Sequence, residues 1–289
     1  MDSGLIILCF SGCYAVALLL ELPGLWSRVR FRRMACLIAA STGVIAQTAY
    51  LGQRVIEMPH VPLASHHDWL MLAAWLVAVI YVGALFYYPR ASLGLFLLPA
   101  VLALVGVAMI AETEPLASYV APRVWGLVHG VFLLLGTVAV LLGFLAGLMY
   151  LVQSYRLKHK LPPAEGLRLP SLEWLERVNS RSLGAAALLV GGGFLTGVLS
   201  RFTQQGGQGS VPWGDPVVLS LIAMLGWLVV AEVFRLVYPA ARQGRKVAYL
   251  TIAAFLFLLL MLATVTLSDS LHSTYVEIAR HATGEGGVR

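Results

Sequence analysis

The chain has 289 residues, of which 59% are hydrophobic and only 12% are charged, and its formal net charge is +6. A soluble domain of this length does not bury so much apolar surface, so the composition indicates a protein with several membrane spans. Basic patches with interleaved aromatic residues are absent, and we therefore expect no nucleic-acid partner.

Eight apolar segments follow one another along the chain, and each has the length expected of a transmembrane helix. The predicted spans are about 3–22, 34–56, 68–88, 92–110, 123–153, 181–200, 214–235 and 246–268. The predicted fold class is an all-α integral membrane protein, a bundle of about eight transmembrane helices with no soluble domain. Residues 1–289 are predicted to form a single polytopic membrane domain.

Lysine and arginine are distributed unequally between the two sides of this predicted bundle. Fifteen of them lie in the loops after spans one, three, five and seven, and five lie on the other side. Basic loops stay in the cytoplasm, so both termini are predicted to face outward from the cell inner (cytoplasmic) membrane, with the lipid bilayer as a partner.

The three cysteines, Cys9, Cys13 and Cys36, lie in or near the first two spans, and no CxxC motif accompanies them. We interpret them as buried structural thiols.

Residues 154–180 form the longest polar stretch, in which Ser171 is a candidate helix cap before an apolar stripe beside Trp174. We expect a short helix lying on the cytoplasmic surface there, with a solvated connector as the alternative.

Glycine pairs at four-residue spacing mark places of close packing. The pairs are Gly126-x3-Gly130, Gly143-x3-Gly147 and Gly193-x3-Gly197. Such spacing allows a helix or a flat ligand to approach the backbone. Gly130 directly follows His129, and we expect it to leave room beside that imidazole.

Histidine is concentrated on the predicted outer side, which carries six of the seven: His60, His66, His67, His129, His272 and His281. A bis-histidine haem site needs two imidazoles from opposite walls among apolar neighbours. His129 and His272 satisfy this requirement from two different helix ends. A zinc site at His66, His67 and Asp68 is the alternative, although adjacent residues on a helix point apart.

The loop 201–213 is glycine-rich and ends in Trp213-Gly214-Asp215-Pro216. One interpretation is an interfacial tryptophan, an Asp helix cap and a proline in the first turn. The other is a surface for a flat ligand between two histidine-bearing helix ends. Arg123 and Arg201 are candidates to pair with haem propionates or with lipid phosphates.

Four short stretches, taken in order, carry a family resemblance. They are Pro62-Leu-Ala-Ser-His-His-Asp-Trp69 with His60 ahead of it, Trp125-Gly-Leu-Val-His129, Asn179-Ser-Arg-Ser-Leu-Gly followed by Phe194–Ser200, and Leu271-His-Ser-Thr-Tyr275. They resemble the cytochrome c assembly membrane proteins of the CcsA/ResC/CcmC group, and most closely the shorter branch typified by YpjD and HemX. The resemblance covers a core of about 60–275.

The resemblance implies that His129 and His272 are axial ligands of a non-covalent haem b, and that Trp213 and Asp215 belong to a haem platform. It implies a protein that holds or presents haem at the outer face and assists cytochrome c biogenesis, with apocytochrome c or another assembly subunit as its partner. The family's tryptophan-rich motif is reduced here to a single Trp, and Val233 stands where full-length synthases carry an inner histidine.

Two alternative functions fit the same sequence. One is a HemX-like regulatory or scaffold subunit of tetrapyrrole metabolism, and the other is a permease component, although the span interiors are expected to lack polar residues.

Glu232 is an intramembrane acid for which we expect pairing with Arg235. A hydrolase triad of Ser268, Asp269 and His272 has no nucleophile elbow, so we see no self-contained catalytic site; the chain is at most part of a haem-attachment system.

Overall fold

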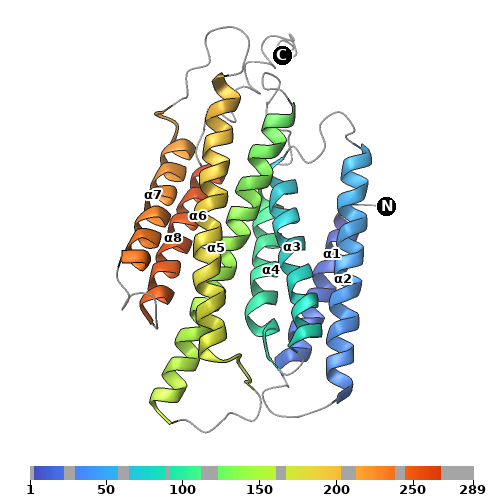
Figure 1. Ribbon diagram of the computed structural model, residues 1–289. Helices are drawn as coiled ribbons and strands as arrows, with labels where there is room; N and C mark the ends of the chain where they lie inside the picture. The colour runs from blue at the N-terminus through green and yellow to red at the C-terminus, as the bar shows by residue number, and fades with distance from the viewer. Residues whose placement is uncertain are drawn as a thin grey trace. The chain divides into compact units, whose positions relative to one another are not determined.

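The computed structural model describes residues 3–22, 30–57, 65–88, 91–111, 123–160, 167–202, 213–237 and 245–267. These residues form eight helices (Figure 1): α1 Ser3–Glu21, α2 Arg30–Glu57, α3 His66–Tyr87, α4 Gly94–Ile110, α5 Arg123–Lys158, α6 Leu172–Phe202, α7 Pro216–Val237 and α8 Arg245–Leu267. Seven of the described helices are long and apolar enough to cross a membrane, and α4 is shorter, with 17 residues. The predicted all-helical membrane bundle is confirmed.

The chain divides into two compact units, which are Met1–Glu114 with Leu145–Val178 and Pro115–Phe144 with Asn179–Arg289. In the first unit, α1 contacts α2 and α4, and α3 also contacts α2 and α4. These four helices therefore close into a ring. Helices α5 and α6 each contribute one segment to either unit, and the second unit also contains α7 and α8.

The interior of the first unit contains polar side chains that hydropathy did not reveal. Gln47 is fully buried; its side chain accepts a hydrogen bond from the Tyr14 hydroxyl at 2.7 Å and donates one to the Met71 carbonyl at 3.1 Å. A polar group surrounded by lipid or apolar side chains is costly unless it is paired in this way. The expectation that the span interiors lack polar residues is therefore wrong for this unit, and the polar groups stabilise helix contacts.

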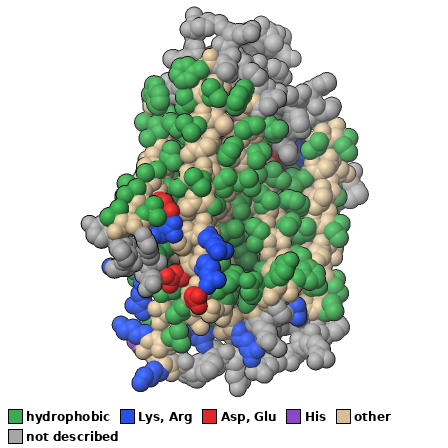
Figure 2. Space-filling model, in the orientation of Figure 1, with side chains coloured by type: hydrophobic (Ala, Val, Ile, Leu, Met, Phe, Trp, Pro, Cys, Tyr) green, Lys and Arg blue, Asp and Glu red, His purple; other side chains and the backbone are tan. Residues whose placement is uncertain are grey.

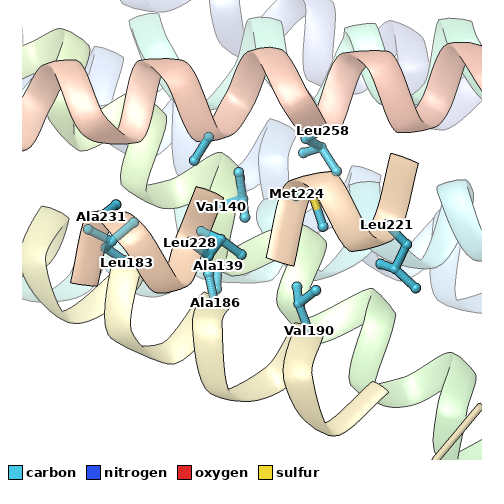
Figure 3. Packing of buried hydrophobic residues seen from close by; sticks show 11 residues of the cluster. Ala139, Val140, Leu183, Ala186, Val190, Leu221, Met224, Leu228, Ala231 and Leu258 are labelled. Atoms are coloured by element: carbon cyan, nitrogen blue, oxygen red, sulfur yellow. The ribbon is translucent and has the colours of Figure 1, made fainter. Parts of the chain in front are cut away.

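The core of the second unit is built from small and branched side chains of four helices (Figure 3). Its buried members are Ala139, Val140, Leu183, Ala186, Val190, Leu221, Met224, Leu228, Ala231, Ala254 and Leu258. Beside this cluster, the rings of Phe144 and Phe255 stack with centroids 3.9 Å apart. The core therefore packs segments of α5, α6, α7 and α8 against one another.

The segment before the sixth span differs from its prediction. Ser171 does cap a helix, since its hydroxyl lies 3.3 Å from the backbone N–H of Trp174. That helix is α6 itself, which runs without interruption from Leu172 to Phe202, so a separate surface helix is not formed. The apolar residues of the stripe pack instead: Leu175 is fully buried, and the Trp174 indole donates to the Tyr88 hydroxyl at 2.8 Å. Packing in the first unit thus extends the helix beyond its hydrophobic span.

The surface agrees with a multi-pass membrane protein. On the face drawn in Figure 2, hydrophobic side chains cover most of the helix walls, and Lys and Arg lie mainly near one end. The last turns of α5 and α7 carry Arg156, Lys158 and Arg235. Which end faces the cytoplasm remains a prediction of the loop charges.

Only one of the three cysteines is buried as expected. Cys36 is buried, and its thiol lies 3.8 Å from the carbonyl of Ala17. Cys13 is half-buried and Cys9 is exposed on α1. The prediction of three buried thiols is therefore wrong for Cys9, because that position faces outward from the ring.

Candidate functional site

His129 lies in the second turn of α5 and is held by the backbone of α6. Its Nδ1 is 2.7 Å from the carbonyl oxygen of Gly193. A carbonyl can only accept a hydrogen bond, so the neutral ring carries its proton on Nδ1 and its lone pair on Nε2. The lone pair of an imidazole is what binds a metal ion, and a ligating histidine usually donates its other N–H to such an acceptor. The geometry of His129 therefore fits a ligand to iron.

The His129 ring rests on a glycine of α6. A Cβ atom placed on Gly197 would lie 2.8 Å from Cε1 of His129 and 2.9 Å from its Nδ1. Real Cβ atoms do not make contacts this short, so only glycine accommodates the ring where it lies. Gly193 and Gly197 thus form one surface: the first supplies the carbonyl and the second leaves the space.

The same helix pair is close-packed further along. A Cβ on Gly192 would lie 2.8 Å from the Phe132 ring, and one on Gly136 of α5 would lie 2.8 Å from Val190 of α6. Small residues at an interface allow two backbones to approach each other. This confirms that the Gly193-x3-Gly197 pair marks close packing, and it explains how a carbonyl of α6 comes within reach of a side chain of α5.

The Trp213-Gly214-Asp215-Pro216 turn begins α7. Asp215 is buried, with 3% of its surface exposed, and its Oδ1 accepts the backbone N–H of Val217 at 2.8 Å. This is a helix N-cap, and Pro216 fits the first helical position because its missing N–H would have no partner there. Trp213 is exposed. The structure thus shows the capping interpretation of Asp215, and a haem platform at this turn remains a prediction.

Several predicted site features lie at one end of the second unit. Helix α5 begins there, α6 ends there, α7 begins there and α8 ends there (Figure 1). His129 and the Trp213 turn therefore share this end, and Gly130 is half-buried beside His129. His272 follows the last residue of α8, Leu267, by five positions. His272, His60 and the side chains of Arg123 and Arg201 lie outside the described residues.

The alternative metal site in the first unit is not formed. His67 is buried, with Nδ1 2.8 Å from the Ala108 carbonyl and Nε2 2.8 Å from the Tyr50 hydroxyl. Asp68 is paired with Arg54, whose Nε lies 3.0 Å from Oδ1. Both side chains are used in helix contacts. No group of three or more His, Cys, Asp or Glu side chains with metal-site geometry occurs in the described part of the chain.

Glu232 is paired as expected. The Arg235 guanidinium binds both carboxylate oxygens, with Nε 3.0 Å from Oε2, and it also contacts the Ser180 hydroxyl of α6. A forked, hydrogen-bonded contact of this kind satisfies the carboxylate where α7 passes α6. This is the structural pairing that the spacing of the two residues predicts.

The fold and these contacts define a multi-pass helical membrane protein with an oriented histidine at one end of its second unit. The chain belongs to the cytochrome c assembly protein family, because the family model described as Cytochrome C assembly protein matches residues 63–272. It is similar to the cytochrome c biogenesis protein CcsA of Gloeobacter violaceus, with 24% identity over 144 residues. That match covers 46% of this chain and 42% of the relative, so the chain matches less than half of that protein's length. No solved structure matches.

The sequence predicts His129 as a ligand, but it does not predict that the Gly193 carbonyl holds the ring. Gly193 and Gly197 were predicted to pack helices, and their direct contact with the His129 ring was not foreseen. The sequence contained one indication of this contact, because the Gly193-x3-Gly197 pair lies on the helix that follows the one bearing His129. Which side chain such a pair accommodates depends on the helix register, and the sequence does not give that.

Proposed function

We propose that the chain is a haem-binding membrane protein that assists cytochrome c biogenesis by holding haem b at its outer face. In this proposal, His129 and His272 would hold the haem iron. Trp213 and Asp215 would contribute to the haem platform, and Arg123 and Arg201 are the candidate partners of the propionates. Apocytochrome c, or another assembly subunit, takes part as the partner. The protein resides in the cytoplasmic membrane with both termini outward.

One observation carries this proposal. The hydrogen bond from His129 Nδ1 to the Gly193 carbonyl places the ring's lone pair on Nε2 and fixes the ring plane. An imidazole held in this way at a membrane edge, among apolar helices, suits iron in a macrocycle. Bound haem would supply an iron atom that accepts imidazole ligands; the chain supplies the ligand, its orientation and the apolar wall.

Family membership supports a role in cytochrome c biogenesis. The buried polar groups of the first unit do not favour a permease, because Gln47 bonds to Tyr14 and to the helix backbone. The HemX-like regulatory alternative would use the polar stretch 154–180 as a docking surface, and deleting residues 160–176 would remove most of it. Deleting them would also remove the first turn of α6 and its Trp174–Tyr88 contact, so it is not a clean test.

The biological role is tested in a host strain whose own copy of the gene has been deleted. Membranes are separated on a denaturing gel, and c-type cytochromes are detected by the peroxidase activity of their covalent haem. Wild-type protein is expected to restore the cytochromes, and His129→Ala and His272→Ala are each expected to reduce them at least tenfold, because each removes an iron ligand.

The controls are His159→Ala and His281→Ala. His159 is exposed, follows the last turn of α5 and packs on Tyr155, and His281 lies in the same terminal segment as His272. Both variants are expected to restore cytochromes as wild type does. Unchanged c-type cytochromes in the deletion strain itself would contradict the proposed role.

A further inference from the structure

We propose that Gly193 and Gly197 of α6 are positioning residues that lock His129 in one tautomer and present its Nε2 atom as the iron ligand. This inference rests on the proposed haem-binding function, and it adds the atom that binds and the structure that selects it. The histidine seat, as we name it, comprises the Gly193 carbonyl and the bare Cα of Gly197.

The hydrogen bond selects the atom. At 2.7 Å, the distance from Nδ1 of His129 to the Gly193 oxygen is at the short end of the range for an N–H donor. The Thr196 hydroxyl lies 2.9 Å from the same oxygen and 2.8 Å from the Gly192 oxygen, so its single proton is shared between these two carbonyls. An Nδ1–H that is bonded in this way cannot exchange its place with the lone pair without losing the bond. Nε2 is therefore the ligating atom.

The contact with Gly197 fixes the ring in place. The ring edge, Cε1 and Nδ1, lies within 3 Å of the position where a Cβ would stand on Gly197. Any larger residue pushes the ring away from α6 and stretches its bond to the carbonyl. The orientation of the proposed iron ligand on α5 therefore depends on the absence of a side chain at Gly197 of α6.

The seat also has a chemical consequence. A carbonyl that accepts Nδ1–H raises the electron density on Nε2 and strengthens the bond to the metal, and losing such a partner typically costs about 10–100-fold in metal affinity. A more basic axial ligand favours ferric over ferrous iron. The seat thus tunes the site toward tight binding of oxidised haem.

The tautomer is tested without haem. Wild-type protein labelled with ¹⁵N only in histidine is purified without haem in detergent at mildly alkaline pH, and the ring nitrogens are read by NMR. The His129 signal is identified as the one lost in His129→Gln. We expect Nδ1 to be protonated and Nε2 to be unprotonated. Protonation on Nε2 would overturn the seat, whatever the protein's affinity for haem.

The position is tested by three alanine substitutions on α6. Gly197→Ala displaces His129, whereas Gly192→Ala presses on Phe132 in the same helix pair and Gly191→Ala meets only Leu225 at an ordinary 3.7 Å. We expect Gly197→Ala to weaken haem binding about tenfold or more, to shift the ferric visible and electron paramagnetic resonance spectra, and to raise the reduction potential. Gly191→Ala should keep the wild-type spectra and potential, whereas Gly192→Ala shows how much the spacing of α5 and α6 alone contributes.

The outcomes separate this inference from the function on which it rests. If the wild type binds haem through His129 but Gly197→Ala behaves like Gly191→Ala, the seat is wrong and the haem site stands. If the wild type shows the predicted tautomer but binds no haem, the seat stands and its purpose as an iron-ligand holder is overturned. If Gly197→Ala does not fold, the tautomer in the wild type decides the question.

Discussion

At the scale of single residues, His67 and His129 can be compared directly. Each donates its Nδ1–H to a backbone carbonyl, at 2.8 and 2.7 Å. Nε2 of His67 also accepts the Tyr50 hydroxyl, and the residue is only 4% exposed, so its ring is enclosed by the first unit. His129 is half-buried at a helix end of the second unit. The same residue type is therefore a helix link in one unit and a candidate ligand in the other.

His67→Ala should lower stability without changing the haem site. The substitution leaves a cavity and removes the hydrogen bond between the buried Tyr50 hydroxyl and His67 Nε2, which together cost about 2–4 kcal/mol. We expect this loss in unfolding by SDS in mixed micelles, together with an unchanged visible spectrum of haem-loaded protein. A loss of haem with unchanged stability would show that the two histidines have been assigned the wrong roles.

The Arg54–Asp68 pair should contribute measurably to stability. Its side chains are 15% and 4% exposed, so Arg54→Met leaves a carboxylate buried and unpaired. We expect a loss of about 2 kcal/mol, below the full cost of breaking a buried pair because Arg54 reaches the surface. The matched control is Arg177→Met, which breaks the exposed Arg177–Glu173 pair and should cost about 0–0.5 kcal/mol. Equal effects of the two substitutions in the same unfolding assay would contradict this account.

At the scale of helices, glycine decides how closely α5 and α6 approach. Gly136→Ala would place a methyl group 2.8 Å from the Val190 side chain and 3.3 Å from its backbone nitrogen. The backbone nitrogen cannot relieve the contact by a change of side-chain rotamer. We expect a loss of about 1–3 kcal/mol from this overpacking. Gly226→Ala on α7 meets nothing within 4 Å and should stabilise by up to about 1 kcal/mol through helix propensity.

Both substitutions are measured by unfolding in mixed micelles. The opposite signs are the essential result, because a general sensitivity of membrane helices to glycine replacement would give both variants the same sign. Equal destabilisation by Gly136→Ala and Gly226→Ala would therefore contradict the packing assigned to α5 and α6.

Helix positions were predictable to within a few residues in most cases. A run of about twenty apolar residues is long enough to span a membrane, and there its backbone hydrogen bonds are satisfied within a helix. The beginning of α6 was not predictable. Residues 172–180 are amphipathic, and their pattern is the same for a surface helix and for the extension of a span. Packing of Leu175 and Trp174 in the first unit decided between the two, and such tertiary contacts leave no trace in local composition.

At the scale of the whole molecule, the asymmetry of fifteen basic residues against five predicts both termini outward. Alkaline phosphatase fused after residue 289 should therefore be active, because it folds only outside the cytoplasm, and the same fusion after residue 160 should be inactive. A green fluorescent protein fusion at each position provides the reverse control. A phosphatase active only at residue 160 would invert the topology and place His129 at the cytoplasmic face.

The site was predictable only in part. His129 could be chosen because it opens a long apolar helix, and Asp215 and Pro216 could be recognised as a helix start from their types and order. The Gly193 carbonyl could not be chosen, since every residue has one and only the helix register selects it. The buried Gln47 and Tyr14 were hidden for a similar reason, because a polar side chain in an apolar run becomes informative once its partner is known.

The central claim is that His129 and His272 hold haem, and the haem content of the purified protein tests it most directly. Protein from haem-replete cells is measured by its visible spectrum and by the pyridine haemochromogen assay. The account predicts haem b in the wild type and in the His159→Ala/His281→Ala double variant, and none in the His129→Ala/His272→Ala double variant. A wild type without a Soret band, or a His129→Ala/His272→Ala protein with an unchanged one, would contradict it.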